Sequence, residues 1–184
     1  MIEAEIKARV ADPDALARVL AQRAAPRVEI YRDTYYDTPD ERLDRAGQEL
    51  RVRTVDGAAG SRTVLTFKGA AVDEASGSKP ERETGVEDAA ATHALLRGLG
   101  YVPSIAFEKH CRNYAFHAYG RDLLATLVSV PELDGHFLEV ETLAPEPDLA
   151  AALADVHRIL IELGVGEADL TRELYTDAVR ARRG

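Results

Sequence analysis

The chain has 184 residues, enough for one domain with a hydrophobic core of its own. Its net charge of −9 argues against a nucleic-acid-binding protein, and no apolar run approaches the roughly 20 residues that span a bilayer. A single cysteine, Cys111, excludes an intramolecular disulfide and a metal site built from several cysteines. No signal peptide is recognisable, so we expect a cytoplasmic protein without a membrane or nucleic-acid partner.

The first ten residues, MIEAEIKARV, alternate strictly between apolar and charged side chains. Glu3, Glu5 and Lys7 fall on one face of this segment, and Ile2 and Ile6 fall on the other. A period of two predicts a β-strand with one dry face and one charged face.

Seven more strands and four helices are predicted along the chain. The strands lie at about 1–10, 31–40 with its closing turn, 49–54, 62–68, 80–87, 107–116, 122–130 and 136–143. The helices lie at about 12–24, 88–99, 148–163 and 169–182, and a small polar loop lies at 69–79. Short turns favour antiparallel pairing, and about eight strands can close a small barrel. We therefore expect an α+β fold.

Several predicted strands carry acids and bases on one face and aliphatic residues on the other. Beyond the first strand, the charged positions are Arg51, Arg53, Lys68, Glu81, Glu83, Lys109, Arg112, Glu139 and Glu141. Lys109 and Arg112 differ in parity, so both face one side only with a bulge or twist. For any one of these strands, a charged face exposed to solvent is an equally good interpretation. Taken together, with apolar helices available to cover the aliphatic faces, the charged faces are expected to point into a closed sheet.

A charged interior is unstable unless its charges are matched. An internal salt-bridge network is one solution, and a bound guest is another. Arg and Lys bind phosphate oxygens, Arg in bidentate fashion, while Glu carboxylates bind Mg²⁺ or Mn²⁺, which commonly bridge to substrate phosphates. A metal–triphosphate would match both halves of this lining.

The segment Glu3-Ala-Glu5-Ile-Lys7 resembles the ExExK signature of the CYTH superfamily, the triphosphate tunnel metalloenzymes. The resemblance extends over essentially the whole chain through YYDTPDERL, LRVR, TFKG, a glutamate pair, KHCR, GHFLEVE and a closing helix with Tyr175. It implies a single domain, 1–184, with an eight-stranded antiparallel closed β-barrel at about 1–143. Helices pack on the outside of this barrel, and the C-terminal helices lie at about 148–182.

The resemblance also implies roles for individual residues. The metal would be held by Glu3, Glu5, Glu139 and Glu141. The triphosphate would be bound by Lys7, Arg51, Arg53, Lys68, Lys109 and Arg112. Catalytic roles fall to Glu3, Glu5 and Lys7, while Glu81 and Glu83 would line the tunnel in a role that varies among members. One position departs from the family pattern, because Val128 stands where members often carry an acidic residue.

The segments YYDTP…LRVR and VPELDGHFLEVE are most similar to class IV adenylate cyclases, which convert ATP to cyclic AMP and pyrophosphate. The resemblance implies Mg²⁺ or Mn²⁺ as cofactor. A hydrolase of inorganic, thiamine or nucleoside triphosphate is the alternative, and a non-catalytic polyphosphate-binding module, which Val128 favours, is a second. Family members are commonly dimers, so a homodimer stays open beside a monomer. Asp37-Thr38-Pro39-Asp40 is expected to form a turn with a helix-capping aspartate.

Overall fold

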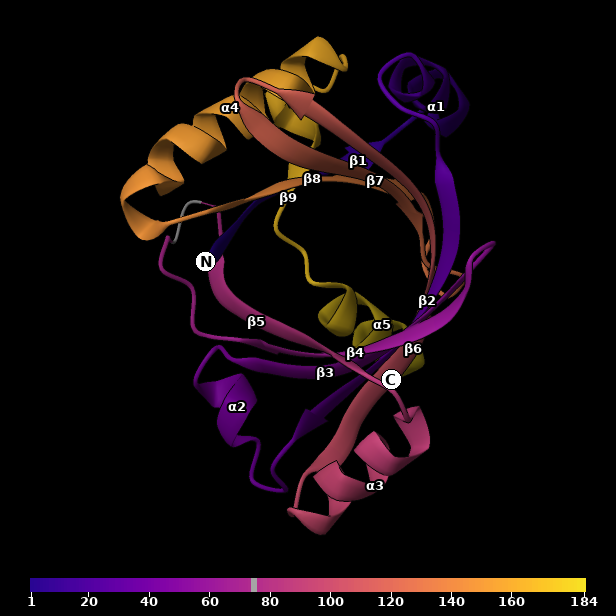
Figure 1. Cartoon of the computed structure of the whole chain (residues 1–184), viewed down its shortest axis with the longest axis vertical. Coiled ribbons are helices and arrows are strands. Elements are labelled where there is room, and N and C mark those ends of the chain that lie inside the picture. Colours follow the sequence, from indigo (N-terminus) through magenta and orange to yellow (C-terminus); the bar gives the residue numbers. More distant parts are fainter. Residues whose placement is uncertain (74–75) are drawn as a thin grey trace.

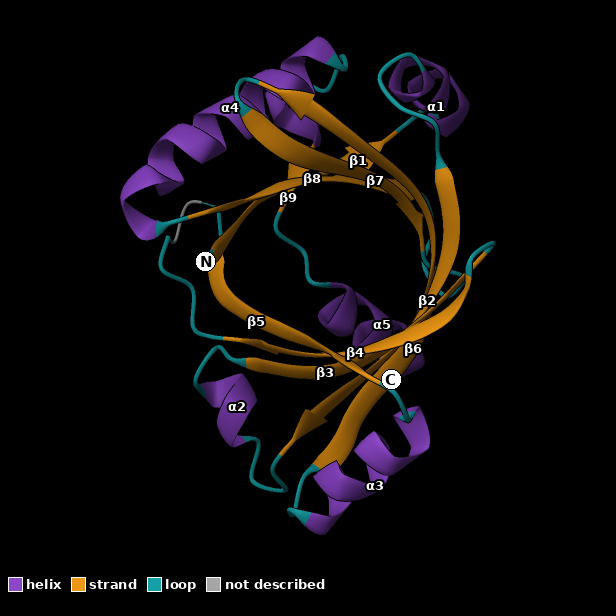
Figure 2. Ribbon diagram, viewed as in Figure 1, coloured by secondary structure: helices purple, strands orange, loops and turns teal. Residues whose placement is uncertain are grey.

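The computed structural model describes residues 1–73 and 76–184, and it confirms the closed eight-stranded antiparallel barrel with helices outside (Figures 1 and 2). The strands are β1 (Ile2–Val10), β2 (Arg27–Asp37), β3 (Glu49–Gly57), β4 (Gly60–Lys68), β5 (Lys79–Val86), β6 (Val102–Ala118), β7 (Arg121–Ser129), β8 (His136–Ala144) and the short β9 (Leu170–Thr171). The helices are α1 (Pro13–Ala21), α2 (Arg42–Arg45), α3 (Ala89–Gly98), α4 (Leu149–Glu162) and α5 (Tyr175–Arg183), with 3₁₀ turns η1 (Glu146–Asp148) and η2 (Glu167–Asp169). Within the described ranges, no helix combines the length and apolarity needed to span a bilayer.

The barrel strands follow the order β5-β4-β3-β2-β6-β7-β8-β1, and β1 closes the ring onto β5. One edge of β1 pairs with β8 over its whole length. The other edge pairs with β5 only at Ile2 and Glu3, and with β9 at Lys7 and Ala8. The C-terminal part of the chain therefore completes the edge that the barrel strands leave open.

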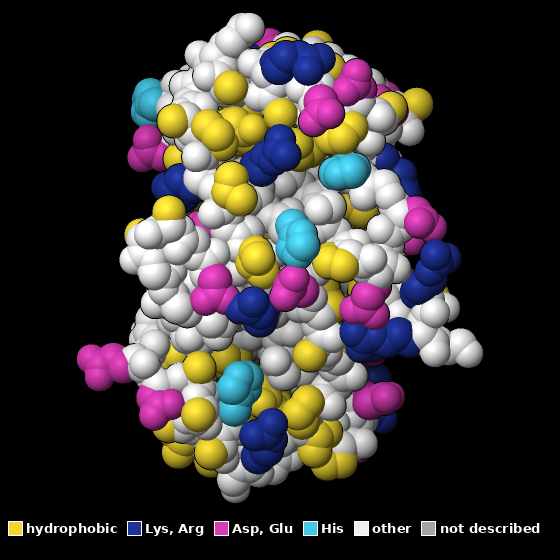
Figure 3. All heavy atoms as spheres, turned by 90° about the vertical axis from the view of Figure 1, so that its right-hand side faces the viewer, with side chains coloured by type: hydrophobic (Ala, Val, Ile, Leu, Met, Phe, Trp, Pro, Cys, Tyr) yellow, Lys and Arg dark blue, Asp and Glu magenta, His cyan; other side chains and the backbone are white. Residues whose placement is uncertain are grey.

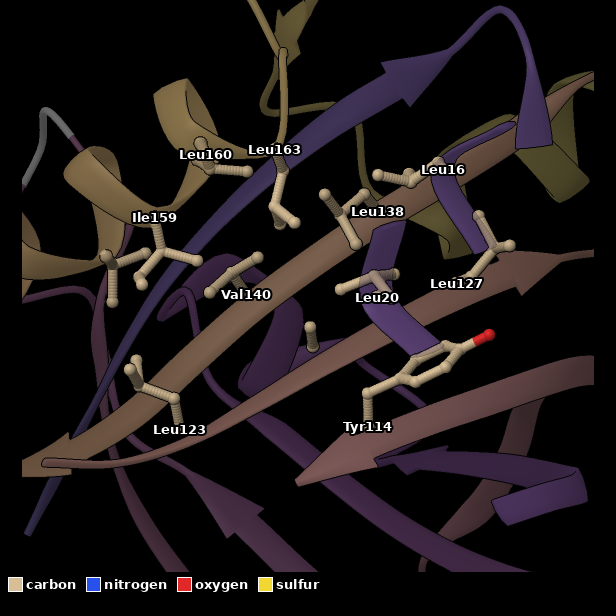
Figure 4. Packing of buried hydrophobic residues seen from close by; sticks show 12 residues of the cluster. Leu16, Leu20, Tyr114, Leu123, Leu127, Leu138, Val140, Ile159, Leu160 and Leu163 are labelled. Carbon is tan, nitrogen blue, oxygen red and sulfur yellow. The ribbon is translucent and has the colours of Figure 1, made fainter. Parts of the chain in front are cut away.

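Aliphatic side chains cover the outside of the barrel and pack against the helices. Figure 4 shows Leu16 and Leu20 of α1 and Ile159 of α4 packed over Leu138 and Val140 of β8. On the opposite side, α2 and α3 cover β2 and β3 through a separate apolar cluster (Figure 1). Burial of these outer faces turns the other face of each strand, which carries the charges, toward the barrel interior.

Charged side chains remain on the outer surface as well. On the face shown in Figure 3, acidic and basic side chains are interspersed. The outer surface carries exposed ion pairs such as Arg32 with Glu108, at 3.2 Å, and Arg183 with Glu132, at 2.7 Å. Exposed pairs of this kind contribute little to stability, about 0–1 kcal/mol each.

The predicted C-terminal helix at 169–182 is wrong at its beginning. Leu170 and Thr171 form β9, and α5 begins only at Tyr175. The free edge of β1 offers backbone hydrogen-bonding groups to this segment, and that pairing overrides its local helix preference. The segment leads α5 to one end of the barrel (Figure 1), where Tyr175 and Val179 are buried.

Candidate functional site in the barrel interior

The barrel encloses a cavity of about 780 Å³ whose walls carry charges of both signs. The predicted site residues that line it are Glu3, Glu5, Lys7, Arg51, Arg53, Lys68, Glu81, Glu83, Lys109, Glu139 and Glu141. They come from six strands and converge because the alternation of side chains along each strand places them on the inner face of the barrel. The expected charged interior is therefore present.

Arg112 does not line this cavity, and its predicted place there is wrong. The pairing of β6 with β7 continues without interruption from His110 to Ala118, so side chains alternate strictly along this stretch. Lys109 points inward, and Arg112 is exposed on the outer surface beside a separate hollow of about 340 Å³. Asn113, rather than Arg112, is the next polar side chain of β6 in the interior. It donates to Glu29 at 2.7 Å.

Three glutamates form the acidic end of the cavity. Glu5 and Glu141 are direct partners in the β1–β8 ladder, and Glu3 follows on the same face of β1. Each offers a carboxylate oxygen, and these oxygens lie within 4.8 Å of one another. Burial raises the pKa of Glu5 to about 7, with further contributions from the charges of Glu139 and Glu3. Burial also raises the pKa of Glu141 well above its ordinary value.

Glu139 lies outside this acidic cluster and pairs with Lys109 at 3.3 Å. Burial opposes ionisation of Glu139, but the charges of Lys109 and Lys7 outweigh it and lower the pKa of this carboxyl. Of the four glutamates expected to hold metal, the structure thus brings three together and places the fourth among the cations.

The cations lie beside the acidic cluster along β3 and β4. Lys68 forms ion pairs with Glu3 and, at 3.2 Å, with Glu81. Arg51 donates a hydrogen bond to the hydroxyl of Thr66 at 3.3 Å, and its guanidinium lies 4.0 Å from the carboxylate of Glu83.

Arg53 makes a bidentate ion pair with Asp33, at 2.6 and 2.7 Å. Burial works against the ionised form of Asp33, yet the guanidinium charge dominates and lowers its pKa to about 2. Asp33 is not among the site residues predicted from the sequence. The sequence does contain a signal for Asp33. It occupies an odd-numbered position of β2, as do Tyr31 and Tyr35, and these two tyrosines line the cavity.

The C-terminal segment closes the cavity beside Lys7 and Lys109. Lys7 donates a hydrogen bond to the backbone oxygen of Glu173. Its Nζ lies 4.4 Å from the centre of the Tyr175 ring, and Nζ of Lys109 lies 4.8 Å from the same centre. Tyr175 was noted in the sequence only as part of the closing helix, because its place in the barrel depends on tertiary structure.

Val128, which stands where family members often carry an acidic residue, faces a different part of the interior. It is fully buried in an apolar cluster with Cys111, Phe137 and Tyr175. The β7 residue opposite Glu141 is Leu124. The valine therefore packs against the closing helix and is not part of the acidic cluster.

A divalent cation and a phosphate chain fit these residues. Hard cations such as Mg²⁺ and Mn²⁺ bind carboxylate oxygens, and Glu3, Glu5 and Glu141 supply them at close range. Among the described residues, the buried Nε of Arg51 has no hydrogen-bond partner. Buried donors are rarely left unpaired, so this atom is available to an anionic ligand in the cavity.

The comparisons with known proteins agree with this geometry. The "Putative adenylate cyclase MJ0240" of Methanocaldococcus jannaschii is 24% identical over 180 residues, covering 96% of this chain and 98% of that protein. The structure of the PH1819 protein of Pyrococcus horikoshii is 28% identical, with a TM-score of 0.86 and coverage of 98% and 99%.

A Hippeastrum protein shares the fold at 19% identity, with a TM-score of 0.69 and coverage of 98% and 96%. It is described as "putative adenylyl cyclase HpAC1", with a dominant triphosphatase activity. The family model of the CYTH domain matches residues 1–175, nearly the whole chain. The chain is a member of the CYTH domain family.

Proposed function

We propose that this protein is a divalent-metal-dependent enzyme that acts on a triphosphate substrate inside the barrel. One observation carries the proposal. Three converging carboxylates and a set of buried Lys and Arg side chains line the same cavity. An acidic cluster alone would suit a metal, and a basic wall alone would suit any anion. Their combination is best matched by a metal-bound phosphate chain.

In this proposal Glu3, Glu5 and Glu141 hold Mg²⁺ or Mn²⁺ through their carboxylate oxygens. The bound ion would supply Lewis-acid chemistry and neutralise charge on the phosphate oxygens. Such an ion would also account for three neighbouring carboxyl groups in a buried place. The pKa values of Glu5 and Glu141 are raised, and a bound cation would remove the repulsion between the ionised carboxylates.

The basic side chains bind and orient the phosphate chain. Among the described residues, the Nε of Arg51 has no hydrogen-bond partner and can serve this purpose. Lys68, at the end of β4, forms an ion pair with Glu3 of the acidic cluster. Lys7 and Lys109 stand at the end closed by Tyr175. Fixed positive charges at these places would stabilise the negative charge that develops on a departing pyrophosphate or phosphate.

The activity that we propose first is that of a class IV adenylate cyclase. In that reaction the ribose 3′-hydroxyl of ATP attacks the α-phosphorus and pyrophosphate leaves. The name of the Methanocaldococcus jannaschii relative supports this choice, as do the cyclase-like segments around residues 35–53 and 130–141. The cavity of about 780 Å³ falls within the ~300–1,000 Å³ range of small-molecule sites, so it has the size for a nucleotide.

A triphosphatase is the second candidate, and the activity described for the Hippeastrum protein favours it. The same lining would then direct a water molecule at a terminal phosphorus. The cytoplasmic location and the open choice between monomer and homodimer stay predictions from the sequence.

One assay separates the candidates. Purified protein is incubated with Mg²⁺ or Mn²⁺ and either ATP or inorganic triphosphate, and cyclic AMP, pyrophosphate and phosphate are quantified. Cyclic AMP with an equal amount of pyrophosphate supports the cyclase. Phosphate release without cyclic AMP supports the triphosphatase. Calorimetric binding without turnover identifies a binding module. The proposal is overturned if the protein neither binds nor turns over any of these substrates.

A further inference from the structure

Lys7 and Lys109 come from two strands, β1 and β6, that do not pair with each other, yet one ring lies against both of them. Their Nζ atoms lie 4.4 and 4.8 Å from the centre of the Tyr175 ring, inside the distance of about 6 Å at which a cation and an aromatic face attract. Tyr175 begins α5, so the ring is supplied by the C-terminal helix and not by the barrel.

Lys7 also contacts the backbone of this segment. Among the described residues, no carboxylate forms an ion pair with its ammonium group. Its one hydrogen bond goes to the backbone oxygen of Glu173, two residues before Tyr175. An ammonium group on four rotatable bonds has several rotamers, and the segment 173–175 selects one of them.

The Tyr175 ring is itself held firmly. It packs at right angles against Phe137, with ring centres 5.2 Å apart and an interplanar angle of 86°. Only 8% of Tyr175 is exposed, and Val179, one helical turn further, is fully buried in the same cluster. Its hydroxyl lies near Glu139, but no described group forms a hydrogen bond of good geometry with it. The ring makes the direct contacts with the two ammonium groups, while the hydroxyl lies beside Glu139, the ion-pair partner of Lys109.

We propose that Tyr175 is a positioning residue of the phosphate site, whose ring holds Lys7 and Lys109 in the arrangement that binds the phosphate chain. The inference rests on the proposed function and deepens it. It makes the Tyr175 ring a requirement for tight phosphate binding, because two of the cavity's cations take their places against this ring.

The test compares three variants by calorimetric binding of inorganic triphosphate, once with Mg²⁺ and once in EDTA, and by melting temperature. Tyr175→Phe keeps the ring and is expected to bind within about twofold of the wild type. Tyr175→Leu removes the ring and is expected to weaken binding at least about tenfold, because Lys7 and Lys109 must then be ordered by the ligand when it binds. Val179→Ala is the packing control, since it loosens α5 but leaves the ring in place.

Val179→Ala is expected to lower the melting temperature while keeping the wild-type affinity. Equal affinity of Tyr175→Leu and wild type would overturn the inference, as would equal weakening by Val179→Ala or by Tyr175→Phe. A wild-type protein that binds no triphosphate in either buffer would overturn the proposed function together with the inference. Wild-type binding that Tyr175→Leu leaves unchanged would overturn the inference alone.

Discussion

Glu5 of β1 and Glu141 of β8 are direct partners across an antiparallel ladder, and both side chains point into the barrel. Like charges placed opposite each other destabilise a sheet. Here burial adds to the repulsion and raises the pKa of both carboxyls. A bound cation would compensate the repulsion within this pair, and a divalent cation is the ligand that we propose at this position.

Replacement of Glu5 by Gln is expected to abolish metal-dependent turnover while keeping the fold. The amide removes one anionic ligand and, with it, part of the repulsion, so the metal-free variant should melt at or above the wild-type temperature. Turnover, circular dichroism and thermal melting without metal check this. Glu87→Gln at an exposed position is the matched control and should behave like the wild type. Full activity of Glu5→Gln would contradict the assignment of this carboxylate.

The stabilisation by metal should increase with pH. A carboxyl whose folded-state pKa is raised stabilises the protein at low pH, and this contribution is lost as pH rises from the ordinary 4.5 to the folded value of about 7. A cation binds the deprotonated form, so it competes with protons below about pH 7. The rise in melting temperature with Mn²⁺ should be larger at about pH 8 than at about pH 6. A rise independent of pH would show that Glu5 is not a ligand.

Arg53→Ala is expected to raise the substrate concentration needed for turnover more than it alters metal preference. It should also destabilise the protein by about 3–5 kcal/mol, because the buried Asp33 loses its bidentate partner. The pKa of Asp33, about 2 in the folded protein, lies below its ordinary 3.8. The stabilisation is therefore complete above 3.8 and lost as pH falls toward 2. Denaturant unfolding at neutral and acid pH measures this.

The matched control for Arg53→Ala is the double variant with Asp33→Asn, in which no buried carboxylate is left without a partner. It should recover part of the lost stability but not the affinity for substrate. A variant that recovers both would show that Arg53 serves the fold alone.

Most of the barrel interior could be predicted because a period of two is a local property of the chain. Once the aliphatic face of β1 or β8 is known to be covered, Glu5 and Glu141 must point inward. The place of Tyr175 could not be predicted in this way. Leu170 and Thr171 form a strand and not a helix because β1 offers them a free edge, and that edge exists only in the folded barrel.

Arg112 and Lys109 test the role of parity directly. The two residues stand three positions apart on one strand, so the regular pleat sends them to opposite faces. Lys109→Ala is expected to weaken triphosphate binding at least about tenfold, since it removes a buried charge that faces the cavity. It also leaves Glu139 without its ion-pair partner. Arg112→Ala removes an equally basic side chain from the outer surface and should bind within about twofold of the wild type, as measured by calorimetry with inorganic triphosphate. Equal losses of affinity in both variants would mean that long-range electrostatic attraction, and not contact inside the barrel, governs binding. In that case added salt should reduce both losses of affinity.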